Sequence, residues 1–208
     1  MKYIKYVREH FKDPKFPVFT LYDLRTALRL EGISDAYLKR LVNSLMKKEE
    51  ITRITRGVYT FHDDVTVAGF AYRPFYYGME DALSIRGLSE QGTNPYIMTT
   101  KNVRTGVRTF KGRNYVIRRI PERMFFGYEL LQYYNFWIPV SDVEKSFIDM
   151  LYFEKNIRDE LLAEIIPKIS MSKLRDYLKG YDKSFSKKVI RLCDSLPRLK
   201  SWASDVTL

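Results

Sequence analysis

The chain has 208 residues, of which 45% are hydrophobic and 29% are charged. This is the composition of a folded globular protein with enough chain to bury a core, and it excludes a disordered tail and a fibrous protein. No segment approaches the roughly 18 apolar residues of a membrane helix. The first residues, MKYIKYVREHFK, lack the apolar stretch of a secretory signal peptide. We therefore expect a cytoplasmic protein.

The chain is strongly basic. Lys and Arg number 36 against 25 Asp and Glu, which gives a formal charge of +11 at pH 7. Such a charge attracts polyanions, among them DNA, RNA and acidic membrane surfaces. Many basic proteins bind none of these, so charge alone leaves nucleic-acid binding open.

Residue types that carry much enzyme chemistry are scarce. One cysteine, Cys193, and two histidines, His10 and His62, exclude an intrachain disulfide and Cys/His zinc motifs. The sequence also has no phosphate-binding glycine loop and no nucleophile elbow. Cys193 lies on an apolar stripe and is expected to be buried. We therefore expect no enzymatic activity, no cofactor and no metal.

The first sixty residues predict helices followed by a β-hairpin. Apolar side chains recur at helical spacing in 4–11, 21–28 and 38–45. The segment ITRITRGVYTF follows, and Gly57 suits the positive φ of a tight turn. Two helices joined by a short Gly-containing turn, then a basic hairpin, are typical of a winged helix-turn-helix domain. The helices are expected to begin at capping residues: Thr20 with Asp23, and Ser34.

The third of these helices has a polar face suited to a DNA major groove. Arginine can pair with guanine, asparagine with adenine, and lysine or serine with phosphate. Arginines on the hairpin could reach phosphates or the minor groove. The alternative is that these side chains only solvate an exposed helix face. The candidate DNA-binding residues are Tyr37, Lys39, Arg40, Asn43, Ser44, Lys47, Arg53 and Arg56.

The overall prediction is an α+β protein with a winged helix-turn-helix domain at 1–66 and a mixed α/β domain at 67–208 that ends in helices. The polar residues after the hairpin predict a boundary or linker near 62–72. The elements expected beyond it are a helix over 76–86, a strand over 95–100, a hairpin over 105–120 turning at Lys111-Gly112, edge strands at 125–126 and 137–138, and helices from Asn156 onward, the later ones opening at Ser172 and at Ser184 or Ser186.

Ser141 and Glu144 predict a capping box at the start of another amphipathic helix. Glu144 and Asp149 resemble a pair of catalytic carboxylates, but residues five apart lie on different faces of a helix. Lys145 precedes Asp149 by four residues, which is the spacing of a favourable ion pair. We interpret Glu144 and Asp149 as structural residues, with Lys145 and Asp149 forming a surface pair.

Residues 101–123 hold eight Lys and Arg against the single Glu122, a net charge of +7. On a hairpin these cations would line a ribbon able to follow a phosphate backbone. Alternatively, they protect an edge strand from pairing with other chains. The candidates for this second nucleic-acid surface are Lys101, Arg104, Arg108, Lys111, Arg113, Arg118 and Arg119.

The order of these segments resembles the AbiEi-type antitoxins, transcriptional regulators of type IV toxin–antitoxin systems. The matching segments are the N-terminal helices ending in RGVYTF, then FYYGMEDALSIRGLSEQ, the basic hairpin, and IPVSDVEKSFIDMLYF. The resemblance spans roughly 18–195, and it depends on the order of the segments because each consists mostly of packing residues. The family often has His-Gly-Leu where this chain has Arg86-Gly87-Leu88.

The resemblance implies a DNA-binding repressor of its own promoter, acting at inverted repeats through the third helix and the hairpin. It also implies an antitoxin that opposes a nucleotidyltransferase-type toxin without a stable complex, and it supplies no catalytic residue. The alternative is an RNA-associated or protein-interaction module that uses the 101–123 hairpin and keeps the winged helix as a scaffold. A metal-dependent nuclease would need a carboxylate–lysine cluster that the predicted strands lack. Binding as a homodimer and binding as cooperative monomers both remain open.

Overall fold

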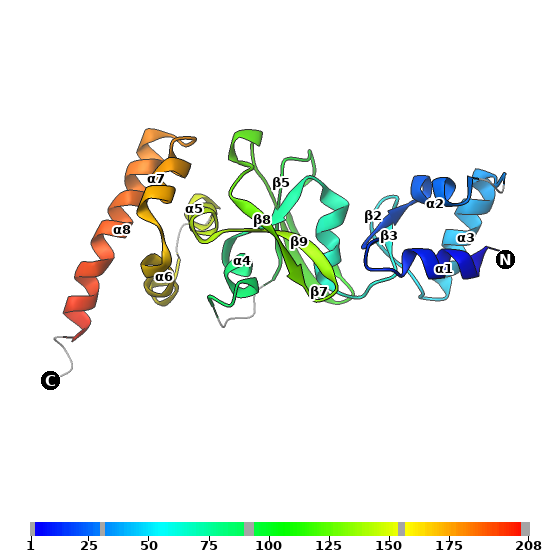
Figure 1. The fold of residues 1–208 in the computed structure, drawn as a ribbon, viewed down its shortest axis with the longest axis horizontal. Coiled ribbons are helices and arrows are strands. Elements are labelled where there is room, and N and C mark those ends of the chain that lie inside the picture. Colours follow the sequence, from blue (N-terminus) through cyan, green and yellow to red (C-terminus); the bar gives the residue numbers. More distant parts are fainter. Residues whose placement is uncertain (1–2, 30–31, 90–93, 154–156, 205–208) are drawn as a thin grey trace.

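The computed structural model describes residues 3–29, 32–89, 94–153 and 157–204, with side chains as far as Asp194. It is a mixed α/β structure with two sheets, in agreement with the predicted α+β class. Its parts follow one another along the long axis: an N-terminal helical unit, a central sheet, and the C-terminal helices (Figure 1).

The N-terminal unit has the predicted helices and hairpin. Thr20 and Asp23 form the expected capping box, the Ser34 side chain accepts from the Tyr37 backbone N–H, and Gly57 has a φ of +79°. A short first strand was not predicted; it pairs with the second strand of the hairpin and completes a small antiparallel sheet ordered β1-β3-β2. The elements are α1 (Ile4–Phe11), β1 (Phe19–Thr20), α2 (Leu21–Ala27), α3 (Asp35–Lys47), β2 (Thr52–Thr55) and β3 (Val58–Thr60).

Most of the predicted linker at 62–72 is a buried element instead. Residues Val65–Tyr72 form the 3₁₀ helix η2, and every one of them is buried. The sequence VTVAGFAY has no charged or strongly polar face, so it is stable only when it is covered on all sides. The expectation of a linker is therefore wrong for this segment.

The larger sheet has the strand order β6-β7-β5-β4-β9-β8, with β5–β7 and β4–β9 parallel and the other pairs antiparallel. Side chains alternate between its faces, as in any strand. Phe75 and Tyr77 pack in the core that contains η2, whereas Tyr76 packs in the core that contains the helices after the sheet. The strands are β4 (Phe75–Tyr77), β5 (Tyr96–Thr99), β6 (Gly106–Phe110), β7 (Arg113–Arg119), β8 (Tyr128–Tyr133) and β9 (Phe136–Ser141).

Several predictions around this sheet need correction. The helix expected over 76–86 is shorter, α4 (Met79–Ile85), because Tyr76 and Tyr77 pair with β5 as a strand. Strand β8 was not predicted, and 125–126 is not a strand. Residues 137–138 belong to β9, which lies between β4 and β8 and is therefore interior. The strand at 95–100 and the hairpin turning at Lys111-Gly112 are confirmed.

The C-terminal part is helical, as predicted. Its expected start at Asn156 lies outside the described residues. Ser172 lies inside a helix whose cap is Ser170, and the last helix already begins at Lys183. None of the helices in the described ranges is long and apolar enough to cross a membrane. The remaining elements are η3 (Glu122–Met124), α5 (Val143–Phe153), α6 (Asp159–Ile165), η4 (Ile166–Lys168), α7 (Met171–Leu178) and α8 (Lys183–Ser204).

Candidate nucleic-acid interface

Helix α3 presents one polar face to solvent. Its apolar face, made of Leu38, Leu41, Val42 and Leu45, is buried in the core of the N-terminal unit. On the opposite side, a stripe of exposed polar residues follows the helical spacing of three and four residues. Within the described ranges, none of the three cations in this stripe has an acidic partner. The stripe consists of Lys39, Arg40, Asn43 and Lys47.

Tyr37 departs from the expected position on this face. It is half-buried, and its ring contacts that of Tyr3 edge-to-face, with 5.9 Å between the centroids. Its ring therefore packs α3 against the start of α1. Ser44 is half-buried and lines a hollow beside the stripe. Lys48 lines the same hollow and is exposed. It directly follows Lys47 in the sequence, and that neighbour could have identified it as a further candidate.

Ion pairs hold α3 at both ends. At its C-terminal side, the Arg8 guanidinium donates to both carboxylate oxygens of Glu50 at 2.5 Å. This pairing lowers the pKa of Glu50. At the N-terminal side, Arg25 of α2 pairs with Asp35. Asp35 and Glu50 are thus paired with cations outside the polar stripe, so neither of them neutralises a cation of the stripe.

The β2–β3 hairpin joins the N-terminal unit to the larger sheet. Ile54 and Val58 are half-buried against the core that contains η2. Arg53 and Arg56 are exposed, as predicted. The Thr60 hydroxyl fixes the hairpin from the other side by donating to the backbone carbonyl of Pro17 at 2.7 Å.

The basic residues of 101–119 do not form one continuous ribbon. On β7, Arg113 and Arg119 share a face with the buried Tyr115, whereas Arg118 lies on the opposite face, near the Phe153 ring of α5. Arg108 lies over the Tyr72 ring and donates to its hydroxyl at 3.1 Å.

Other cations of this segment are also engaged. Lys101 donates to the carbonyl of Ala71, Lys111 pairs with Asp63, and Arg119 donates to Asn102. In the parts that the structure describes, Arg104 and Arg113 are exposed and neither has an acidic partner. The structure thus leaves a smaller free basic area here than the sequence predicts.

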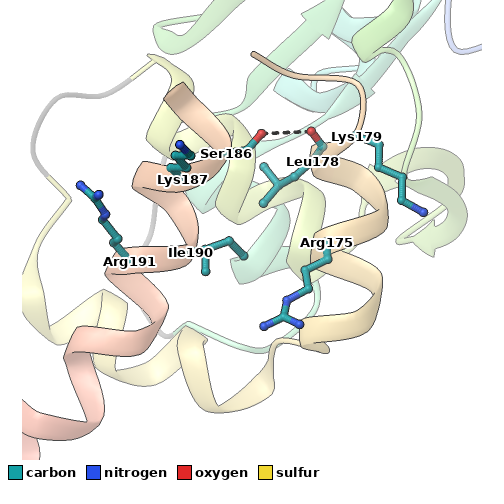
Figure 2. A pocket seen from close by; sticks show the side chains of 7 residues that line it. All are labelled: Arg175, Leu178, Lys179, Ser186, Lys187, Ile190 and Arg191. Carbon is teal, nitrogen blue, oxygen red and sulfur yellow. Dashed lines mark hydrogen bonds between the residues drawn. The ribbon is translucent and has the colours of Figure 1, made fainter. Parts of the chain in front are cut away.

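Sequence reasoning missed a basic groove between α7 and α8 (Figure 2). The hollow has a volume of about 420 Å³, and Leu178 and Ile190 line its apolar part. The Ser186 hydroxyl of α8 donates to the Leu178 carbonyl of α7 at 3.1 Å and so links the two helices. Cations from both helices surround the hollow at a spacing of four residues, and that spacing was visible in the sequence. They are Arg175, Lys179, Lys187 and Arg191.

A polar cleft of about 440 Å³ lies where η2, α4 and the β6–β7 turn meet, and Asp64, Arg113 and Tyr133 are among its lining residues. Asp64 already accepts from the backbone N–H and the hydroxyl of Thr66, so it caps η2. In the described ranges, no group of three His, Cys, Asp or Glu side chains could hold a metal ion. The cleft therefore has the polar character of a binding site without a set of metal ligands.

The expected surface pair of α5 is one of the most buried features of the molecule. The side chains of Lys145 and Asp149 are 0% and 2% exposed. Lys145 Nζ donates to Asp149 and to the Tyr181 hydroxyl at 3.0 Å, and the Tyr76 hydroxyl donates to Asp149 at 2.8 Å. The ammonium group also lies 5.2 Å from the centre of the Phe126 ring. Burial lowers the pKa of Lys145 and raises that of Asp149, while their mutual attraction opposes both shifts.

The start of α5 also differs from the expected capping box. Asp142, and not Ser141, caps the helix by accepting from the Lys145 backbone N–H at 2.8 Å. Glu144 instead accepts from the Ser170 backbone N–H at 2.8 Å, at the beginning of α7. The charged residues of α5 therefore connect the sheet to the C-terminal helices. Cys193 is buried as predicted, and burial raises the pKa of its thiol to about 11.

No protein-family model matches this chain, and no curated protein sequence matches it. Among solved structures, the crystal structure of the RV2827C protein from Mycobacterium tuberculosis is similar, with a TM-score of 0.61 and 14% sequence identity. The similarity covers 94% of this chain and 78% of that protein. The two proteins therefore share a fold over most of their lengths.

Proposed function

We propose that this protein is a sequence-specific DNA-binding transcriptional regulator, in which residues 1–66 form a winged helix-turn-helix domain and α3 is the recognition helix. The polar stripe on α3 carries the proposal. It combines cations that have no acidic partner within the described residues with an amide, on a helix whose other face is fixed in a core. Such a rigid helix can enter a major groove and contact both bases and phosphates.

The hairpin supports this assignment. Arg53 and Arg56 are exposed on it, while Ile54 and Val58 anchor its other side. Cations presented in this way can contact the phosphates that flank a groove. The proposed DNA surface is therefore Lys39, Arg40, Asn43, Ser44, Lys47, Arg53 and Arg56, with Lys48 added and Tyr37 assigned to packing.

A gel shift titrated with salt tests the proposal. We expect DNA from upstream of the gene to bind at least about 10³-fold more tightly than random duplex of equal length. Arg40→Ala or Asn43→Ala should cost about 1–3 kcal/mol on the preferred site and relax base preference there. Lys47→Ala should weaken all duplexes similarly and reduce the salt dependence. Lys188→Ala makes the same charge change on α8, at the opposite end of the molecule from α3 (Figure 1), and serves as the control.

Binding that none of the α3 variants affects would refute the role of this helix. Binding that is lost only when Arg104 and Arg113 are both changed to alanine would instead favour the RNA-associated or protein-interaction module. Both residues are exposed, and within the described chain neither has an acidic partner, whereas Lys101 and Arg119 donate to Ala71 and Asn102.

We further propose that the regulator is an AbiEi-type antitoxin that represses its own promoter and opposes a nucleotidyltransferase-type toxin. The order of sequence segments supports this narrower assignment. Co-expression with the product of a neighbouring nucleotidyltransferase gene tests it, because an antitoxin restores growth. Failure of that rescue, combined with preserved binding to upstream DNA, would leave the DNA-binding function and remove the antitoxin role.

A further inference from the structure

The two edges of the larger sheet are built differently. At one edge, β6 contains Arg108 and is flanked by Arg104 and Lys111. Charged side chains of this kind prevent an edge strand from pairing with another chain. At the other edge, β8 has the sequence YELLQY, with no Lys, Arg, Pro or Gly. Within the described residues β8 pairs with β9 alone, so its outer backbone groups are open to a further strand.

Large apolar side chains gather on the same hairpin. Leu130 of β8 is 62% exposed and Trp137 of β9 is 60% exposed. The register pairs Leu130 with Pro139 and Gln132 with Trp137, which places all four side chains on one face of the sheet. Tyr128 shares this face and is also exposed. A contiguous apolar patch beside an open edge strand is typical of a surface that another protein covers.

The charge distribution indicates which partner covers this patch. Between Arg123 and Lys145 the sequence has no Lys or Arg, although the whole chain carries a formal charge of +11. Two such chains repel each other over most of their surfaces. The β8–β9 hairpin adds no Lys or Arg of its own to such a contact, and Arg86, which binds it from the end of α4, is paired. Glu129, the acidic residue of β8, is held by Arg86 of the same chain at 2.8 Å.

We propose that β8 pairs with β8 of a second copy of this chain, so that two larger sheets join into one across a two-fold axis. Antiparallel pairing centred on Leu130 brings the two Leu130 side chains together and sets each Glu129 opposite Leu131 of the other copy, so that like charges do not face each other. The contact is closed, because each copy uses its β8 edge and the β6 edges that remain carry the charged side chains described above. The proposal stands on the hairpin alone and does not depend on DNA binding.

The test is the mass of the full chain by sedimentation equilibrium between about 1 and 100 µM, the range in which moderate self-association appears. We expect the wild-type chain to form a dimer. Leu130→Lys should weaken dimerisation by about tenfold or more, because it places two ammonium groups together in the pairing. Trp137→Ser should weaken it through lost apolar contact. Val107→Lys is the matched control: Val107 is 66% exposed on β6, the opposite edge, and this change should leave the mass unaltered.

Circular dichroism confirms that each variant is folded before its mass is interpreted. A wild-type chain that stays monomeric over the whole concentration range would overturn the proposal. A dimer that persists in both Leu130→Lys and Trp137→Ser would overturn it too. So would a dimer that Val107→Lys disrupts as strongly as Leu130→Lys does.

Discussion

Replacing Lys145 with methionine should be among the most destabilising single changes in this protein. The Asp149 carboxylate would remain, 2% exposed, and among the described residues only the Tyr76 hydroxyl would still donate to it. Breaking a buried ion pair by removing one partner costs about 3–5 kcal/mol, because the other charge stays buried without compensation. Since the total stability of a domain is about 5–15 kcal/mol, this loss would consume a large part of it.

The double variant Lys145→Met/Asp149→Leu should be more stable than the single variant Lys145→Met. It removes both charges, and replacing a buried pair with apolar residues of similar volume is often neutral. The Tyr76 and Tyr181 hydroxyls would lose their charged partners, at about 1–3 kcal/mol for each group that stays buried without a new one. The cost of the double variant should therefore fall well short of the summed costs of the single variants.

Urea denaturation followed by circular dichroism measures these free energies. Lys5→Met is the control, because Lys5 and Glu9 have the same spacing on α1 at 3.9 Å but are exposed; no measurable change is expected. In Lys145→Met the uncompensated burial should raise the pKa of Asp149 further. A raised pKa in the folded state stabilises the protein at low pH, so the deficit should shrink as the pH falls toward the ordinary aspartate value of 3.8. A cost below about 1 kcal/mol for Lys145→Met, or additive single and double variants, would refute the reasoning.

Two further changes test the junction between the N-terminal unit and the sheet. Gly69→Ala should destabilise the protein by about 1–3 kcal/mol in the same assay, because the added Cβ would lie 2.3 Å from a ring carbon of Phe75 and the surrounding core is closed; an unchanged urea midpoint would contradict this. Burial lowers the pKa of His62, so the folded state loses stability as the pH drops below the ordinary value of 6.5. Thermal melts between pH 8 and about 5 should show this decline in the wild type and a weaker one in His62→Gln; equal declines would refute the assignment to His62.

The N-terminal elements could be predicted because their signals are local. Thr20 and Asp23 are three residues apart, Ser34 caps the helix that follows it directly, and Gly57 forms its own turn. The exposed stripe of α3 follows from the same periodicity, because burying one face of a helix exposes the other. These features depend little on distant parts of the chain.

The misjudged features depend on distant partners. Lys145 and Asp149 have the spacing of a surface pair, yet they are buried because Tyr76 and Tyr181 come from β4 and from the connection after α7. Strand β8 has no alternating pattern of apolar and polar residues, so its pairing with β9 was not visible either. The alternation of side chains between the two faces of a strand can be applied to the sequence, however. It places Arg118 on the opposite face from Arg113 and Arg119. Because of that alternation, the cations of 101–123 cannot all lie on one face of the hairpin.

The junction has a consequence for how a DNA-bound N-terminal unit would act. Ile54 and Val58 of the hairpin pack against the core that contains η2, and η2 itself is buried where a linker was expected. A hairpin with one side in this core and Arg53 and Arg56 exposed on it cannot move on DNA independently of the larger sheet. Under the proposed functions, the position of α3 on DNA would therefore also orient the sheet edge at β8. Pairing at that edge would then set the spacing of two DNA half-sites, which is what a repressor of inverted repeats requires.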